Sequence, residues 1–262
     1  MSFIANSFIF NDVPSEIYDL VIITENGAAV VDTAATNSVN LYTDEIYRNP
    51  KPYFYGVQQT PVLTFSLTFG SLKPIDRIKQ QDIQEWLFGQ MNYKKLQIMQ
   101  CDMYDVYFNC FLTDPKATYV GGVSYAFKCT VTCDAPWAWA FEKTKSFGPF
   151  STESNFTINN TSNNLYYTYP FIELKLSQYE TQVSLKNTTD NNTGFSFIGL
   201  QPSEILTIDC EKYIIKSNTG LLRLDNMSGS VVQLLNGINS FHIIGSVEYI
   251  KFTYRDARKV TG

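Results

Sequence analysis

Apolar and polar residues alternate with a period of two over several stretches of the chain, and this pattern most limits what it can fold into. Residues 63–69 read LTFSLTF, so leucine and phenylalanine face one side of an extended strand while serine and threonine face the other. Residues 125–133 repeat the pattern, as do residues 104–112, where the expected buried side begins at Tyr104. Together they predict three half-buried antiparallel strands in one sheet.

One segment, residues 74–88, predicts a helix. Its apolar residues recur at a spacing near 3.6 and form a single stripe: Ile75, Ile78, Ile83, Trp86 and Leu87. Pro74 suits the first helical position, Asp76 falls in the first turn, and Gly89 can close the far end. We therefore expect an α+β first domain in which this helix packs on the sheet.

Residues 25–61 show no clear period and mix short apolar pieces with turn residues. A loop of this length is uncommon in a compact domain, so we expect either a hairpin arm or a binding segment. Exposed apolar residues would be a liability on a monomer, and we interpret them as a partner surface. These candidate interface residues are Val30, Val31, Leu41, Tyr53, Phe54 and Tyr55.

The composition changes after Trp139, because residues 142–164 are rich in Asn, Ser and Thr. We place a domain boundary near Lys145, which gives domains of residues 1–145 and 146–262. Beyond it, short alternating segments recur at intervals of roughly ten residues, as in a β-sandwich. The expected strands are residues 171–176, 181–187, 194–200, 205–216, 231–235 and 246–256. The fold class is therefore mainly β, with an α+β first domain and an all-β second domain.

The composition excludes several classes of protein. With 44% hydrophobic and 17% charged residues, the chain does not resemble a disordered protein. A net charge of −5 leaves no basic field for nucleic acid. No apolar run approaches the roughly 20 residues that span a bilayer. The first basic residue is Arg48, so a secretory signal is not expected either. We expect a soluble protein without membrane insertion.

The residues that usually carry metal or redox chemistry are sparse. The five cysteines are Cys101, Cys110, Cys129, Cys133 and Cys210. Their odd number and wide spacing indicate reduced thiols rather than a disulfide framework. With one histidine and no C-x2-C pair, a zinc site is not expected.

Catalytic arrangements are equally poorly represented. His242 lies inside SFHIIG and is expected to be a buried structural residue. Asp102 with Asp105 is a pair of carboxylates, but hydrolysis of a glycoside needs such groups to converge in a cleft. Neither G-x-G-x-x-G nor G-x4-G-K-[ST] occurs, and DNNTG at residues 190–194 lacks the glutamate that closes a calcium loop. We expect no enzyme, no cofactor and no metal site.

The order of features resembles a known family. SFIFNDVPSEIYDLVI, LTFSLTF, DIQEWLF, VYFNCFLTD and KCTVTCDAPWAW resemble, in this order, the N-terminal belt domain of siphophage distal tail proteins. ILTIDCEKYII (residues 205–215) and LLNGINSFHIIG (residues 234–245) resemble strands of the galectin-like C-terminal domain of that family. The matching residues are Asp134, Pro136 and Trp137 in the first domain and Ile208, Asp209, Leu235, Gly237 and Asn239 in the second.

The resemblance implies a structural virion protein at the distal end of the tail, made in the host cytoplasm. Six copies would form a ring through their belt domains. The ring would cap the tail tube protein and hold the tail hub or tail-associated protein, the end of the tape-measure protein and receptor-binding proteins. Six copies at −5 each would carry about −30. Our hypothesis is that acidic residues face the channel, so that DNA only passes through the lumen without being bound.

Two other roles stand beside this one. A carbohydrate-binding tail or baseplate protein could recognise a host cell-wall glycan, but galectin-type recognition needs a tryptophan on one sheet face. The three tryptophans are Trp86, Trp137 and Trp139, so the second domain has none and sugar binding there is disfavoured. A tail enzyme such as a wall hydrolase is disfavoured by the single histidine.

Overall fold

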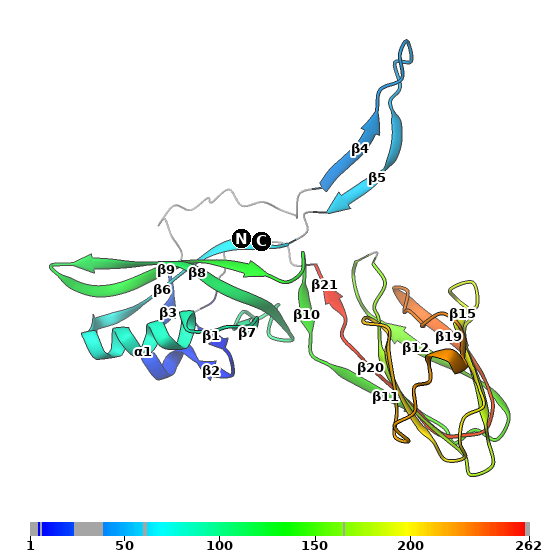
Figure 1. Cartoon of the computed structure of the whole chain (residues 1–262). Coiled ribbons are helices and arrows are strands. Elements are labelled where there is room, and N and C mark those ends of the chain that lie inside the picture. Colours follow the sequence, from blue (N-terminus) through cyan, green and yellow to red (C-terminus); the bar gives the residue numbers. More distant parts are fainter. Residues whose placement is uncertain (1–4, 6, 24–38, 60–61, 165, 260–262) are drawn as a thin grey trace. The chain divides into compact units, whose positions relative to one another are not determined.

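The computed structural model describes residues 5, 7–23, 39–59, 62–164 and 166–259. The chain forms two compact units, Met1–Trp139 with Lys259–Gly262 and Ala140–Arg258. In Figure 1 the first unit runs from blue to green and the second from green to red. Strand is the dominant secondary structure, and the fold class expected from the alternation, mainly β, is confirmed. Lys145, near which the sequence placed a boundary, lies within β11 (Lys143–Phe147) of the second unit.

The first unit is built on an antiparallel sheet with the strand order β2-β1-β7-β8-β9-β6-β3. Its strands are β1 (Phe8–Phe10), β2 (Val13–Pro14), β3 (Val21–Ile22), β6 (Thr64–Ile75), β7 (Lys94–Ile98), β8 (Val106–Val120) and β9 (Val123–Cys133), with a 3-10 turn η1 (Ser15–Tyr18). The three segments predicted from the alternation fall in β6, β9 and β8, which are neighbours. The prediction that they share one sheet is confirmed.

The longest hairpin of the unit joins β8 to β9. Val120 pairs with Val123, so only Gly121 and Gly122 form the turn. Both have positive φ, 59° and 83°, as a tight hairpin turn of this kind requires. The sequence prediction was wrong about Tyr104, which lies in a turn before β8 with 65% of its surface exposed.

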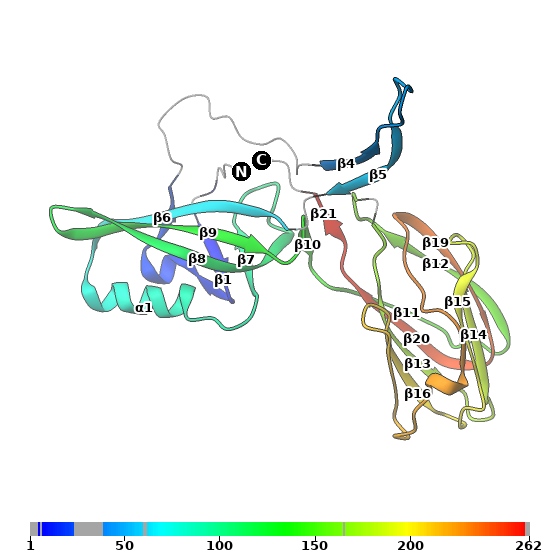
Figure 2. The ribbon, with the colours of Figure 1, turned by 45° about the horizontal axis from the view of Figure 1, so that its top comes forward.

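The one α-helix among the described residues, α1 (Arg77–Phe88), packs on one face of this sheet (Figure 2). Asp76 is its N-cap, and the carboxylate accepts a hydrogen bond from the Lys79 N–H at 2.8 Å. The predicted start at Pro74 was wrong, because Ile75 pairs with Ser124 and continues β6. Ile78 was also wrongly placed in the buried stripe, since it is 76% exposed. The buried face consists of Ile83, Trp86 and Leu87.

Trp86 joins the helix to the sheet. Its indole stacks on Tyr18 and Phe8, with ring centroids 5.0 and 5.9 Å apart. The indole N–H donates to the Phe10 carbonyl oxygen at 3.0 Å, so the polar atom of this buried ring is satisfied. Phenylalanines from β1, β6, β8 and β9 extend the same core.

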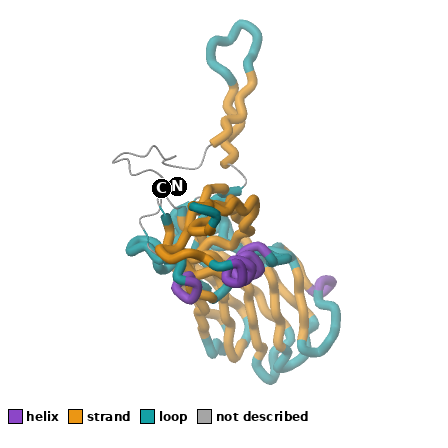
Figure 3. Tube along the Cα trace, turned by 90° about the vertical axis from the view of Figure 1, so that its left-hand side faces the viewer, coloured by secondary structure: helices purple, strands orange, loops and turns teal. Residues whose placement is uncertain are grey.

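Within the described part of the first unit, two strands pair only with each other. They are β4 (Val39–Asp44) and β5 (Tyr53–Gln59), a two-stranded antiparallel hairpin. In Figure 3 they are drawn as two orange strands joined at their end by a loop. We call residues 39–59 the hairpin arm; they are the described part of the arm expected at residues 25–61.

The second unit contains two five-stranded antiparallel sheets, ordered β11-β20-β13-β16-β17 and β12-β19-β14-β15-β18. The strands of these sheets not yet named are β12 (Glu153–Asn160), β13 (Phe171–Leu176), β14 (Gln182–Asn187), β15 (Thr193–Ile198), β16 (Ile205–Asp209), β17 (Ile214–Ser217), β18 (Met227–Gly229), β19 (Gly237–Ile244) and β20 (Val247–Tyr254), with η2 (Leu224–Asn226). Two short strands, β10 (Ala138–Ala140) and β21 (Ala257–Arg258), lie outside these two sheets. Phe241 of β19 and Phe252 of β20 lie 5.1 Å apart between ring centroids. This contact joins the two sheets through the core, as in a β-sandwich.

Three sequence expectations for this unit differ from the structure. Residues 205–216 are not one strand but β16 and β17, joined by a turn in which Tyr213 has a left-handed φ of 55°. Residues 231–235 form no strand; Val231 and Val232 are buried within an irregular segment. Residues 142–164 contain β11 and β12, because Phe156 and Ile158 alternate inward and Asn160 has hydrogen-bond partners for its buried amide.

Candidate functional site

The hairpin arm carries four of the six candidate interface residues, and all four are exposed. Leu41 is 65% exposed, Tyr53 58%, Phe54 59% and Tyr55 62%. Leu41 lies on β4 and the three aromatic residues lie on β5, so strand pairing brings them into one element. The other two candidates, Val30 and Val31, lie outside the described residues.

The aromatic residues occupy both faces of the arm. The Tyr53 and Tyr55 rings lie 5.1 Å apart between centroids, which places them on one face. Phe54 lies between them in the strand and therefore points to the opposite face. An element with exposed aromatic rings on both faces cannot cover them by lying on a single flat surface.

A bulge interrupts the pairing of the arm. Tyr42 pairs with Gly56 and Thr43 pairs with Phe54, so the register shifts and Tyr55 has no residue directly opposite. Gly56 has a φ of 147°, a conformation that residues with a Cβ rarely adopt. Bulges increase strand twist and redirect side chains, so this glycine helps to present Tyr55.

The loop at the end of the arm adds residues that the sequence analysis did not select. Tyr47 is 85% exposed, and the Arg48 guanidinium carbon lies 5.2 Å from its ring centroid. The loop is braced by Asn49, whose N–H donates to the Ile46 carbonyl at 2.9 Å and whose side-chain oxygen accepts from the Lys51 N–H at 3.1 Å. The sequence feature that could have identified Tyr47 as an interface residue is its position within residues 25–61, the segment without a clear period.

The residues considered for catalysis are spread over the fold. His242 on β19 is only partly buried, contrary to expectation, and its Nε2 lies 2.6 Å from a carboxylate oxygen of Glu153 on β12. The pair lies on adjacent strands of one sheet. No group of three or more His, Cys, Asp or Glu side chains suited to a metal ion occurs among the described residues.

All five cysteines are free thiols, and four of them are buried. Burial raises the pKa of Cys129, Cys133 and Cys210 to about 12. Burial also raises the pKa of Cys110. Because a thiolate is the reactive form, these four thiols behave as small core residues rather than nucleophiles.

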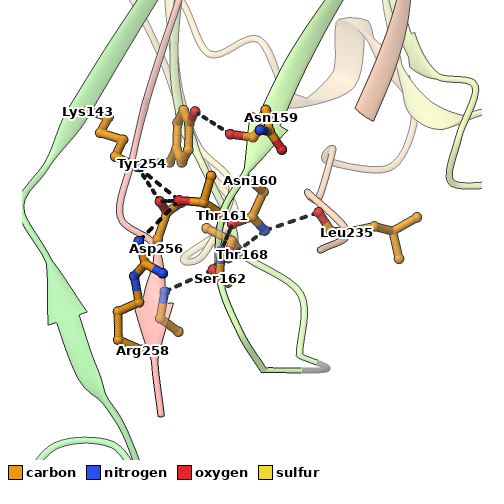
Figure 4. Close-up of polar contacts among 11 residues, drawn as sticks. Lys143, Asn159, Asn160, Thr161, Ser162, Thr168, Leu235, Tyr254, Asp256 and Arg258 are labelled. Atoms are coloured by element: carbon orange, nitrogen blue, oxygen red, sulfur yellow. Dashed lines mark hydrogen bonds and ion pairs between the residues drawn. The ribbon is translucent and has the colours of Figure 1, made fainter. Parts of the chain in front are cut away.

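A buried polar cluster in the second unit is shown in Figure 4. Asp256 is fully buried, and its carboxylate contacts the Lys143 ammonium and the Thr161 hydroxyl. Beside it, the Ser162 hydroxyl donates to Asn160 Oδ1 at 2.7 Å and accepts from the Ala257 N–H at 2.9 Å. The cluster connects β11, β12 and β21, so its role is to hold these strands together.

In the part of the chain that the structure covers, no helix is long and apolar enough to cross a bilayer. The exposed aromatic side chains of the hairpin arm are of the residue type that is enriched at protein interfaces.

Comparison with known proteins agrees with this interpretation. Residues 3–135 match the family model described as the phage tail protein N-terminal domain, and residues 137–254 match the one described as the phage tail C-terminal domain. No curated protein sequence matches the chain.

Two solved structures share the fold. The Dit protein of phage SPP1, described as a paradigm of the hub adsorption apparatus in phages that infect Gram-positive bacteria, superposes with a TM-score of 0.69 at 10% identity, over 96% of this chain and 98% of that one. A chain of the phage p2 baseplate in its activated conformation gives a TM-score of 0.52 at 10% identity, over 95% of this chain and 97% of that one.

The resemblance to distal tail proteins that the sequence motifs indicated is thus confirmed by the family models and by the fold. The two family models together span nearly the whole chain. The chain belongs to the phage tail protein family that these N- and C-terminal domains define, and it is a structural protein of the phage tail and baseplate.

Proposed function

We propose that the chain is the distal tail adaptor of a siphophage, six copies of which form a ring through the first domain. The ring caps the tail tube and connects it to the tail hub or tail-associated protein, the end of the tape-measure protein and the receptor-binding proteins. It sits at the distal end of the virion tail and acts without catalysis.

The exposed aromatic residues of the hairpin arm are the observation that supports the ring most directly. Aromatic side chains are enriched at protein interfaces, and Tyr53, Phe54 and Tyr55 stay more than half exposed in the single chain. Their two-sided arrangement favours insertion between neighbouring copies. A head-to-tail contact of this kind closes into a ring when the rotation per subunit divides a full circle.

The charge of the chain supports the passage of DNA. Each copy carries −5 at neutral pH, so a ring of six has a strongly acidic total charge. We propose that acidic residues face the lumen, where they repel the phosphate backbone and let DNA move through without being retained.

Light scattering on the purified chain tests the ring. The expected species is a hexamer of about 180 kDa, six times the chain mass of 29.8 kDa, with sixfold symmetry in negative-stain images. A double variant, Tyr53→Ser with Tyr55→Ser, removes both rings from one face of the arm and should shift the species towards the monomer.

Tyr179→Ser is the matched control. Tyr179 is 89% exposed on the second unit and lies outside the arm, so its loss should leave the oligomer unchanged. A chain that stays near 30 kDa at every concentration would contradict a ring that closes by itself. A ring that persists in the Tyr53/Tyr55 double variant would show that the arm is not its contact.

A further inference from the structure

An exposed line of aromatic rings lies on the second unit, far in sequence from the arm. Tyr167, Tyr169 and Phe171 are 45%, 40% and 42% exposed, whereas the intervening Thr168 and Pro170 are buried. Thr168 is fixed by two backbone hydrogen bonds with Leu234, of 3.0 and 2.8 Å. The alternation places the three rings on the same side of an extended segment. We call Tyr167, Tyr169 and Phe171 the aromatic row.

The strand register extends this surface sideways. Phe171 on β13 pairs with Asp209 on β16, and Asp209 pairs with Ile214 on β17. Directly paired residues share a face of the sheet, so Ile214, which is 44% exposed, lies on the same face as Phe171. The three strands are neighbours in the sheet order.

Tyr213, next to Ile214, has a left-handed backbone. Its φ of 55° is rare for a bulky residue, and such strain concentrates at functional sites. The pKa of Tyr169 is raised, first by burial and then by Tyr213, Tyr167 and Asp190. Tyr213 is 63% exposed, so its ring is accessible beside Ile214.

Two of the carboxylates around the aromatic row form ion pairs within the protein. Asp209 lies 3.6 Å from the Lys212 ammonium, and Glu173 lies 2.9 Å from the Lys251 ammonium. The Asp190 carboxylate is hydrogen-bonded to the neutral Gln233 amide at 2.8 Å, so it keeps its negative charge and disfavours an anionic ligand. Two ion pairs and one negative carboxylate offer no attraction to a polyanion and little to a polycation, so the chemistry favours an uncharged ligand.

The size of the surface also limits its ligand. The row spans about 13 Å, from four steps of about 3.3 Å along an extended chain. A stable protein interface needs about 800 Å² on each partner, and a single line of rings flanked by ion pairs is too narrow for that. A linear polymer that lies along the row needs no more width than the rings provide.

We propose that the aromatic row binds an uncharged polysaccharide. The apolar C–H faces of the sugar rings would stack on Tyr167, Tyr169 and Phe171. The sugar hydroxyls would exchange hydrogen bonds with the tyrosine hydroxyls, which border the row. The rings are held about half-buried, so little side-chain freedom is lost on binding. Galectin-type recognition stacks the sugar on a tryptophan, which the second domain lacks. Here tyrosine and phenylalanine rings would provide the stacking surface instead.

Native affinity electrophoresis of the full chain tests the proposal. The gels contain hydroxyethylcellulose, glycol chitin or dextran as neutral polysaccharides, and alginate as an anionic one. At least one neutral polymer should retard the protein and alginate should not. Tyr169→Ala should weaken the retardation about tenfold, as expected for one lost aromatic contact. Tyr169→Phe should keep most of it.

Tyr179→Ala is the matched control, because this tyrosine is exposed and lies outside the row. Thermal melting verifies that the variants fold, and Tyr167→Ala provides a second test of the row. Retardation by none of the neutral polymers, or equal retardation of Tyr169→Ala and the unmodified chain, would overturn the proposal. The proposal is independent of the ring, and light scattering on Tyr169→Ala should show the same oligomer as the unmodified chain.

Discussion

Arg223 and Glu204 form a bidentate ion pair in the interior of the second unit. Arg223 Nε donates to Glu204 Oε1 at 2.7 Å, and Nη2 donates to Oε2 at 2.6 Å. The Ser217 hydroxyl and the Gln201 N–H also donate to this carboxylate, at 2.5 and 2.7 Å. Arg223 lies on the segment that leads from β17 of one sheet to β18 of the other. The pair therefore anchors a crossover between the two sheets.

Removing one partner of this pair should strongly destabilise the second unit. The side chains are 6% and 0% exposed, so Arg223→Ala leaves an uncompensated buried carboxylate. The expected loss in the free energy of unfolding is about 3–5 kcal/mol, measured by urea denaturation. Arg255→Ala breaks the exposed pair with Glu142 and should cost less than about 1 kcal/mol. Equal losses in the two variants would contradict this account.

The same carboxylate should make the unit sensitive to acid. Burial raises the pKa of Glu204, but the hydrogen bonds from Arg223, Ser217 and the Gln201 N–H outweigh it and hold the pKa below its ordinary value of 4.5. A carboxyl with a lowered folded pKa stabilises the fold above its unfolded pKa, and this contribution disappears as the pH falls through the folded pKa. The urea midpoint should therefore decline below a pH of about 4.5. Glu204→Gln should flatten this decline, and an unchanged acid slope would exclude Glu204 as its source.

Trp86 should dominate the stability of the helix–sheet contact in the first unit. Trp86→Ala removes the stacking on Phe8 and Tyr18 and the hydrogen bond to the Phe10 carbonyl, at an expected cost of about 3–5 kcal/mol in the free energy of unfolding. Ile78→Ala on the same helix should cost no more than about 0.5 kcal/mol, because Ile78 is 76% exposed. Chemical denaturation followed by tryptophan fluorescence compares the two. A large loss for Ile78→Ala would mean that this residue is covered in the folded protein.

The contrast between Trp86 and Ile78 also shows what the sequence could and could not predict. The alternation over residues 63–69 and 125–133 was sufficient to place both strands in one sheet, because each has a clear apolar face that a one-residue slip would turn to solvent. The spacing of apolar residues identified the helix but not its first residue. Ile75 fits the helical stripe equally well, and only its pairing with Ser124 assigns it to β6.

The candidate surfaces were harder to predict than the fold, because their shape depends on contacts between residues distant in the sequence. The aperiodic composition of residues 25–61 pointed to exposed Leu41 and Tyr53, but not to the bulge at Gly56 that shapes the arm. For the aromatic row, the sequence shows the alternation of Tyr167, Thr168 and Tyr169 but not which side is buried. The bridge between Thr168 and Leu234 decides that, and Leu234 is remote in the chain.

Thiol reactivity should distinguish Cys101 from the other cysteines. Cys101 is exposed, whereas Cys110, Cys129, Cys133 and Cys210 are buried. Burial raises the pKa of the Cys210 thiol to about 12, so its thiolate is scarce at neutral pH. A chromogenic disulfide reagent should therefore titrate one thiol in the native chain and five in denaturant. Cys101→Ser should abolish the fast native reaction and leave the folded state unchanged. A second fast thiol in the native chain would show that one of the two cores opens on the timescale of the reaction.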